Sequence, residues 1–333
     1  MRTLNSMPIM PAPGFVTFNV EIPDIECLNF RSQPADWRRV RVIIMIKKAI
    51  MPVGGFGTRF LPATKAQPKE MLPVVDKPVI QYLVEEAVAS GINEVIFVTG
   101  RGKRAIEDHF DHSFELEYNL VEKGKNKLLR EVERISNLAD FVYVRQPKPL
   151  GDGHAVLCAR KLVNGEPAAV LFGDDLVDSE IPCLKQLMGI FEKYGCAVVA
   201  LQRVPGNEVS QYGVVAAKEI APRIFEINDV VEKPTPSQAP SDLIIIGKYI
   251  IIPEIFNELE LINGKKRTGE IHLADAFKNF LVKGGKMIGY QFQGKRFDCG
   301  DKLGFLKAEV EFGIKHKEIG GRFKEYLEKK FKK

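Results

Sequence analysis

Short apolar runs that alternate with helix-like segments limit the folds open to this chain more than any other feature of its sequence. Alternating strands and helices, with strands that are apolar throughout, indicate an α/β fold. We therefore expect a mixed, mainly parallel sheet with helices on both faces. The strand-like runs are Arg41–Val53, Glu94–Thr99, Phe141–Val144, Ala168–Phe172 and Ala197–Leu201, and the helix-like segments include Pro78–Ala89 and Lys103–His109.

The second half has more strand-like segments and fewer helices between them, which predicts a mixed extension of the sheet. We expect the α/β domain to span residues 45–302. Amphipathic, Lys/Glu-rich helices are expected at 303–333. Residues 1–44 are punctuated by prolines and show no periodicity. They are therefore expected to be a disordered or misassigned N-terminal extension. The late strand-like segments are Val214–Ala217, Ile224–Ile227, Leu243–Ile252 and Met287–Phe292.

Charge and cysteine content exclude several classes of protein. The net charge of +5 arises from 48 basic and 43 acidic residues spread along the chain. The sequence therefore shows no cluster of basic residues of the kind that binds nucleic acid. The five cysteines form no CxxC pair, which argues against a disulfide framework and favours a cytoplasmic location. No apolar run reaches about 18 residues, so we expect no membrane span.

A glycine-rich loop directly follows the first predicted strand, with Gly54, Gly55 and Gly57 ahead of Thr58 and Arg59. In open parallel sheets ligands bind beyond the carboxyl ends of the strands. Glycine amides at such a place can hold phosphate oxygens, although a plain strand-to-helix turn would look similar. The cations Arg59, Lys65 and Lys69 follow closely. Their charge favours a polyphosphate ligand.

Two acidic residues, Asp174 and Asp175, follow the apolar run that ends at Phe172. Mg²⁺ prefers one or two carboxylates together with substrate phosphates. A turn or a helix cap would explain the same residues, so the pattern alone leaves both interpretations open.

A set of ordered motifs resembles the bacterial UTP–glucose-1-phosphate uridylyltransferases, also called UDP-glucose pyrophosphorylases. The resemblance runs from about Met45 to Lys329. It implies a Rossmann-like nucleotidyltransferase domain of the nucleotide-diphospho-sugar transferase type, and a homo-oligomer built partly by C-terminal helices. The motifs are Gly54–Arg59, Leu61–Lys65, Pro68–Pro73, Gly151–Val156, Val231–Pro234, Gly269–Ala276 and Asp298–Gly304.

The resemblance implies a Mg²⁺-dependent reaction in which glucose 1-phosphate attacks the α-phosphorus of UTP and pyrophosphate leaves. It places the metal on Asp174 and Asp298. It assigns Arg59 to the leaving pyrophosphate, and Lys69 and Lys233 to the bridging and sugar phosphates. No protein nucleophile is needed, because a phosphomonoester is largely a dianion at neutral pH.

The resemblance also assigns substrate contacts to Gln146 and Gly151 at the base and to Gly213 and Glu232 at the sugar. Glu70 is a further candidate for a base contact. The chain departs from the family at Asp152, where an apolar residue is usual, and at Lys248, where arginine is usual. The departure at Asp152 bears on the nucleotide preference, and thymidylyl or cytidylyl transfer to a sugar 1-phosphate stays open as an alternative.

Two other classes of function are weighed against this one. A catalytically silent regulatory paralogue is disfavoured by the retained Arg59, Lys69, Asp174 and Asp298. A dinucleotide-dependent oxidoreductase is disfavoured because the chain lacks GxGxxG with a downstream acidic partner.

His109 and His112, three residues apart, lack a third metal ligand at matching spacing. We expect both at an exposed helix end.

Overall fold

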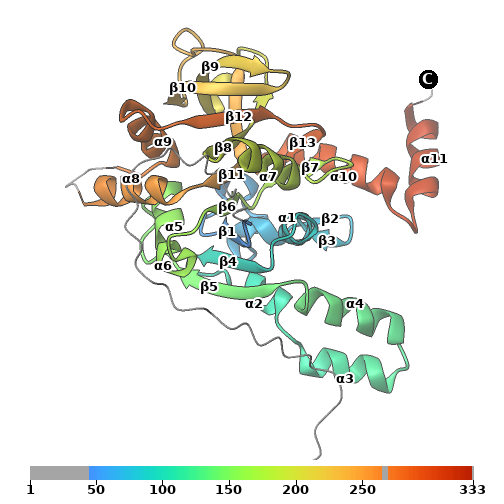
Figure 1. Cartoon of the computed structure of the whole chain (residues 1–333). Helices are drawn as coiled ribbons and strands as arrows, with labels where there is room; N and C mark the ends of the chain where they lie inside the picture. The colour runs from blue at the N-terminus through green and yellow to red at the C-terminus, as the bar shows by residue number, and fades with distance from the viewer. Residues whose placement is uncertain (1–44, 265–268, 332–333) are drawn as a thin grey trace, which may run out of the picture. The chain divides into compact units, whose positions relative to one another are not determined.

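A mixed sheet forms the centre of the fold (Figure 1). The computed structural model describes residues 45–264 and 269–331, and within these the sheet has nine strands in the order β5-β4-β1-β6-β11-β8-β12-β10-β9. The predictions for residues 1–44 lie outside the described residues. The strands are β1 (Lys48–Pro52), β4 (Glu94–Thr99), β5 (Asp140–Arg145), β6 (Ala168–Leu171), β8 (Ala197–Arg203), β9 (Gly213–Ala221), β10 (Ile224–Glu232), β11 (Leu243–Ile251) and β12 (Met287–Gln291).

The sheet is mainly parallel, as predicted. Strands β5, β4, β1 and β6 pair in parallel, and so do β8 and β12. The antiparallel pairings all involve β11 or β10. Only these two strands of the described sheet therefore run against the others. The carboxyl ends of β1, β4, β5, β6, β8 and β12 consequently open at one edge.

Helices cover both faces of this sheet, which confirms the predicted layering. Helices α1, α2, α7 and α10 contribute buried side chains on one face, and α5, α6, α8 and α9 on the other. The helices are α1 (Val79–Ala89), α2 (Arg104–Phe110), α3 (Phe114–Glu122), α4 (Asn126–Ser136), α5 (Asp152–Cys158), α6 (Arg160–Val163), α7 (Cys183–Tyr194), α8 (Pro253–Asn263), α9 (Leu273–Val282), α10 (Lys302–Lys315) and α11 (Gly320–Phe331).

Strand β1 illustrates why its sequence is apolar throughout. Ala49 and Met51 face one core, while Ile50 faces the other, and all three are fully buried. Successive side chains of a strand point to opposite faces, so a strand covered on both sides has no polar face. Among the described residues, no helix is long and apolar enough to cross a membrane.

Two small sheets lie outside the central one. Strand β13 (Lys295–Asp298) pairs with β7 (Asp175–Asp178), and β2 (Pro73–Val74) pairs with β3 (Lys77–Pro78). Short 3₁₀ turns occupy Thr58–Phe60, Ala63–Lys65, Lys69–Met71 and Val209–Gln211. The described residues form one compact unit that includes α10 and α11 together with the sheet.

Candidate active site

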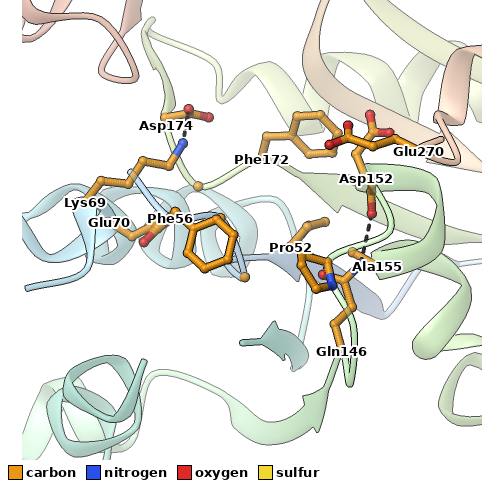
Figure 2. Close-up of a pocket in the computed structure, with 15 residues that line it drawn as sticks. Pro52, Phe56, Lys69, Glu70, Gln146, Asp152, Ala155, Phe172, Asp174 and Glu270 are labelled. Carbon is orange, nitrogen blue, oxygen red and sulfur yellow. Dashed lines mark hydrogen bonds and ion pairs between the residues drawn. The ribbon is translucent and has the colours of Figure 1, made fainter. Parts of the chain in front are cut away.

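A two-lobed cleft lies at the carboxyl edge of the sheet. The first lobe, about 360 Å³, includes Gly54, Gly55, Lys69, Glu70, Gln146 and Gly151 (Figure 2). The second, about 300 Å³, includes Arg59, Gly213, Glu232, Lys233 and Asp298. Asp152, Phe172, Asp174 and Glu270 line both lobes. Most of the site residues predicted from the sequence are thus brought together, with Asp174 where the lobes meet.

The glycine loop after β1 packs tightly at Gly54 and Gly57, whereas Gly55 has open space around it. A Cβ at Gly54 would lie 3.1 Å from Gln146 Oε1, and one at Gly57 would lie 3.1 Å from Lys69 Cβ. Gly57 also has φ +64, a conformation that favours glycine. Gly57 and Thr58 line neither lobe within the described part of the chain. Their place is the turn that directs Arg59 toward the cleft.

Lys69 and Asp174 form an ion pair at the junction of the lobes, with 2.5 Å between Nζ and Oδ2 (Figure 2). Burial alone would lower the pKa of Lys69, but the charges of Asp174 and Glu70 raise it well above its usual range. Burial would raise the pKa of Asp174, and the ion pair with Lys69 reverses that effect and lowers it. Both groups are therefore charged at neutral pH.

Asp298 approaches Asp174 across Gly300. A Cβ at Gly300 would lie 2.4 Å from Asp174 Oδ2 and 3.0 Å from Asp298 Oδ1. Asp298 accepts hydrogen bonds from the Gly300 amide (2.9 Å) and the Tyr212 hydroxyl (3.1 Å). Burial raises the pKa of Asp298, and the nearby carboxylates Asp175 and Asp174 raise it further, while Arg296 opposes them. The ionised form of Asp298 is thus disfavoured here, and a bound cation would favour it.

The two carboxylates fit a magnesium ion only if the substrate supplies further ligands. Carboxylate oxygens are the hard donors that Mg²⁺ prefers. Among the described residues, no group of three or more His, Cys, Asp or Glu side chains could hold a metal. This agrees with the usual behaviour of Mg²⁺, which binds through one or two carboxylates plus phosphates and water.

Asp175 and Arg296 form an ion pair beside Asp298. Asp175 accepts a hydrogen bond from the Gly247 amide at 2.7 Å and pairs with Arg296 Nε. Arg296 Nη2 also lies 3.3 Å from Asp298 Oδ2. The metal assignment made from the sequence did not include Asp175, and Arg296 was not identified. The alternation of β13 places Arg296 and Asp298 on one face, and this signal could have found it.

Gln146 directly follows β5, and its side-chain amide is held in one orientation beside the first lobe. Its Nε2 donates to the Gly151 carbonyl at 2.9 Å and lies 3.1 Å from His154 Nδ1. Burial lowers the pKa of His154, so its neutral form is favoured and Nδ1 can accept that hydrogen bond. With Nε2 occupied in this way, Oε1 points toward Gly54 as an acceptor.

Glu232 and Lys233 lie in the second lobe at the end of β10. Glu232 pairs with Gly213 across strands, and a Cβ at Gly213 would lie 3.3 Å from Glu232 Oε2. Lys233 has φ +45, and its amide donates to the Tyr212 carbonyl at 3.0 Å. A non-glycine residue in this conformation carries strain of a kind that clusters at functional sites.

Glu70 has a protein partner. Its carboxylate lies 2.8 Å from Lys103 Nζ, and both side chains are buried. Burial raises the pKa of Glu70, and Lys103 opposes that effect. Glu70 therefore contributes to the floor of the first lobe, where a Cβ at Gly173 would lie 2.8 Å from its Cγ.

The two departures from the family pattern differ in their consequences. Asp152 Oδ1 accepts hydrogen bonds from the amides of Gly153 (2.8 Å) and Leu273 (3.2 Å), and it lies 3.4 Å from His272 Nδ1. It thereby joins the start of α5 to the start of α9. Lys248 does not reach the cleft, because its side chain is fully buried on the opposite face and pairs with Glu86 at 2.7 Å.

The histidines and the cysteine considered from the sequence have other roles. His109 Nε2 lies 3.0 Å from Gln81 Oε1, and His112 Nδ1 lies 3.0 Å from Glu117 Oε1, so they do not share a site. His109 is half-buried rather than exposed as expected, since its ring lies against Gln81 of α1. Cys299 is buried, and burial raises the pKa of its thiol.

The site combines basic side chains suited to phosphate groups with a pair of carboxylates at the carboxyl edge of a mixed α/β sheet. This combination is typical of a nucleotidyl transferase. The chain belongs to the nucleotidyl transferase family, whose sequence pattern matches residues 48–313. Among its relatives, the UTP–glucose-1-phosphate uridylyltransferase YngB of Bacillus subtilis is 49% identical over 283 residues, which are 85% of this chain and 95% of that protein. The resemblance inferred from the motifs is thus confirmed.

Solved structures give the same result. The chain is similar to a UDP-glucose pyrophosphorylase in complex with UDP-glucose, at 43% identity and a TM-score of 0.74, covering 82% of this chain and 100% of that one. It is also similar to a UTP-bound enzyme of this kind from Acinetobacter baumannii, at 41% identity and a TM-score of 0.78, covering 85% and 99% of the two chains.

Proposed function

We propose that this protein transfers the uridylyl group of UTP to glucose 1-phosphate, forming UDP-glucose and pyrophosphate. The observation that carries the proposal is the cleft of two lobes that share Asp174. One lobe has the glycine loop and Gln146, and the other has Glu232 and Lys233. The names of the relatives specify the same two substrates.

The reaction is a direct displacement. A phosphate oxygen of glucose 1-phosphate forms a bond to the α-phosphorus of UTP, and the bond from that phosphorus to the bridging oxygen of pyrophosphate breaks. The attacking phosphate is already largely a dianion at neutral pH. The protein must therefore supply alignment and charge neutralisation, as in other phosphoryl transfers. The buried, protonated thiol of Cys299 has no role as a nucleophile.

The cations of the cleft divide between the substrates. Lys233 holds the sugar phosphate while Glu232 accepts hydrogen bonds from glucose hydroxyls. Lys69 neutralises the phosphate chain near the reacting phosphorus, and Arg59 holds the leaving pyrophosphate. The amides of Gly54 and Gly55 hold phosphate oxygens. Asp174 and Asp298 would bind a Mg²⁺ ion, which supplies positive charge to the α-phosphate.

Gln146 accounts for recognition of uracil. Its Oε1 accepts a hydrogen bond from N3–H of the base, and cytosine lacks that hydrogen. The Gly151 backbone lies beside it. Thymine has the same hydrogen-bonding edge, so only space around C5 can separate dTTP from UTP. A pocket that crowds one methyl group gives about 10- to 200-fold discrimination.

The test is pyrophosphate release from UTP, dTTP or CTP in the presence of glucose 1-phosphate and Mg²⁺. We expect the highest kcat/KM with UTP, a modestly lower value with dTTP, a much lower one with CTP, and loss of activity in EDTA. Parity between UTP and dTTP would support the thymidylyl alternative. No turnover with any nucleotide would support the silent paralogue. Full activity in EDTA would remove the proposed metal.

A further inference from the structure

Tyr212 lies in the second lobe of the cleft, directly before β9, and the proposed reaction gives it no role. Its carbonyl oxygen accepts a hydrogen bond from the Lys233 amide at 3.0 Å. Its hydroxyl donates a hydrogen bond to Asp298 Oδ2 at 3.1 Å. One residue thus contacts both the main chain of the lysine proposed for the sugar phosphate and the carboxylate proposed for the metal.

The two oxygens of the Asp298 carboxylate have different surroundings. Oδ2 lies 3.1 Å from the Tyr212 hydroxyl and 3.3 Å from Arg296 Nη2. Oδ1 accepts a hydrogen bond from the Gly300 amide at 2.9 Å. A Cβ at Gly300 would contact both Asp298 Oδ1 and Asp174 Oδ2, so Oδ1 is the oxygen on the Asp174 side. The carboxylate is therefore held through Oδ2, and Oδ1 is turned toward the other proposed metal ligand.

The Tyr212 side chain is itself held in place. The Arg296 guanidinium lies over its ring, with 4.9 Å from Cζ to the ring centroid. The Arg296 side chain is only 7% exposed and pairs with Asp175 through Nε. The hydrogen bond from the Lys233 amide fixes the main chain of Tyr212. A side chain that is locked by such contacts can hold a neighbouring functional group in its working orientation.

We propose that Tyr212 is a positioning residue for the metal site. This inference rests on the proposed function, which assigns Asp174 and Asp298 to Mg²⁺. The Tyr212 hydroxyl orients the Asp298 carboxylate before the cation binds, and Tyr212 itself does not touch the metal. A group that hydrogen-bonds a metal ligand in this way is typically worth about 10- to 100-fold in metal affinity or activity.

A direct contact between this hydroxyl and the substrate sugar is the competing role, because Tyr212 lines the same lobe as Glu232 and Lys233. A tyrosine hydroxyl has one hydrogen to donate, and Asp298 accepts it here. The hydroxyl therefore has no hydrogen left for an oxygen of glucose or of its phosphate. The two roles also predict different kinetic changes when the hydroxyl is removed.

Calorimetric titration of the full chain with UTP, once with excess Mg²⁺ and once in EDTA, measures what the metal adds to nucleotide binding. We expect the parent protein to bind UTP more tightly with Mg²⁺. Tyr212→Phe keeps the ring beside Arg296 and the main-chain bond to Lys233 but removes the hydroxyl. Its affinity for UTP should fall about tenfold with Mg²⁺ and stay unchanged in EDTA.

Other results would contradict the inference, and they separate it from the proposed function. An unchanged affinity of Tyr212→Phe with Mg²⁺ would overturn the positioning role alone. An equal loss in both titrations would mean that the hydroxyl shapes the nucleotide site, and would overturn that role too. A parent protein that binds UTP equally well with Mg²⁺ and in EDTA would remove the metal from the proposed function, and the inference with it. No binding of UTP by the parent would overturn both.

Steady-state kinetics provide a second measurement. In Tyr212→Phe the Mg²⁺ concentration for half-maximal rate should rise about tenfold, and excess Mg²⁺ should restore much of kcat. KM for glucose 1-phosphate should stay the same, because the main-chain bond to Lys233 remains. A raised KM with an unchanged Mg²⁺ requirement would assign the hydroxyl to the sugar and overturn the positioning role.

Tyr82→Phe is the matched control. Tyr82 is half-buried like Tyr212, and its hydroxyl donates to the Val74 carbonyl at 3.0 Å. It is not among the described residues that line the two lobes. The UTP affinity and the Mg²⁺ requirement of this variant should therefore equal those of the parent, and a change as large as in Tyr212→Phe would overturn the inference.

Discussion

Asp174 and Asp298 share a proposed role but lie in opposite electrostatic settings. The Lys69 ion pair favours the ionised form of Asp174, whereas burial and neighbouring carboxylates disfavour that of Asp298. Replacing either by asparagine removes one anionic oxygen donor for the metal. We expect kcat to fall about 100-fold or more in both Asp174→Asn and Asp298→Asn, since electrostatic stabilisation of this type is worth about 3 kcal/mol.

The same two variants should differ in stability when metal is absent. Asp174→Asn loses a favourable pairing with Lys69, so its melting temperature in EDTA should fall. Asp298→Asn removes an unfavourable charge, so its melting temperature should stay level or rise. Asp301→Asn is the matched control, because Asp301 caps α10 through the amides of Leu303 and Gly304 and asparagine caps equally well. Near-normal turnover of Asp174→Asn or Asp298→Asn at low Mg²⁺ would contradict its assignment.

His154 is a positioning residue for Gln146. Its Nδ1 lies 3.1 Å from Gln146 Nε2, and this contact, together with the Gly151 carbonyl, keeps Oε1 facing the first lobe. In His154→Phe a ring remains but one of the two acceptors of Nε2 is lost, so the amide is held less firmly and can turn to present Nε2 to the base. We expect the preference for UTP over CTP, measured as the ratio of kcat/KM values, to fall about tenfold. His112→Phe should leave this ratio unchanged, and an unchanged ratio in His154→Phe would remove the positioning role.

A buried ion pair joins three elements of the fold. Lys248 on β11 is fully buried and lies 2.7 Å from Glu86 on α1, whose other oxygen accepts the Leu184 amide of α7 at 3.0 Å. Glu86→Leu would leave an unpaired buried cation. The free energy of unfolding in urea should fall by about 3–5 kcal/mol.

The double variant Glu86→Leu/Lys248→Met should recover much of that loss, because replacing a whole buried pair by apolar groups is often close to neutral. Glu318→Gln breaks the exposed pair with Lys127 and should change stability little. A loss as large in the double variant as in Glu86→Leu would mean that packing, not charge, dominates at this position.

The strands of the sheet were predictable because they are apolar on both faces. The helices that cover it were predictable because their apolar residues recur at helical spacing. The site loops were predictable because they follow such strands. Strand β11 shows what was missed: Ile244, Ile246 and Lys248 alternate with residues of the other face, so Lys248 had to point away from the cleft. The β7–β13 pairing was not predictable, since it joins segments far apart in sequence, each of them short and polar.

At the scale of the whole molecule, exposed apolar side chains gather on the helices remote from the cleft. Phe114 and Tyr118 on α3 are 75% and 57% exposed, and Tyr326 and Phe331 on α11 are 54% and 73% exposed. The α3–α4 hairpin and α11 lie on one side of the view in Figure 1, and Lys127 of α4 pairs with Glu318 just before α11. Where such side chains form a contiguous patch, the patch commonly binds a partner, and we expect this to hold for α3 and α11.

We expect a second copy of the chain to be the partner that binds this surface. Helix α3 carries Glu115, Glu117 and Glu122 and no basic residue, whereas α11 carries more basic than acidic residues. In a two-fold dimer the same patch occurs on both subunits, so α11 of each copy can pack against α3 of the other. We therefore expect a homodimer or a larger even-numbered assembly in solution, in line with the expectation from the resemblance.

Sedimentation equilibrium of single-site variants tests this arrangement. Tyr118→Glu and Tyr326→Glu each place a charge within the apolar surface, so both should raise the dimer dissociation constant by at least about tenfold, because burying an unpaired charge costs several kcal/mol. Val282→Glu is the matched control, since Val282 is 80% exposed on α9, which does not belong to this surface. If Tyr118→Glu and Tyr326→Glu associate as the parent does, or if Val282→Glu alone dissociates, the interface lies elsewhere on the molecule.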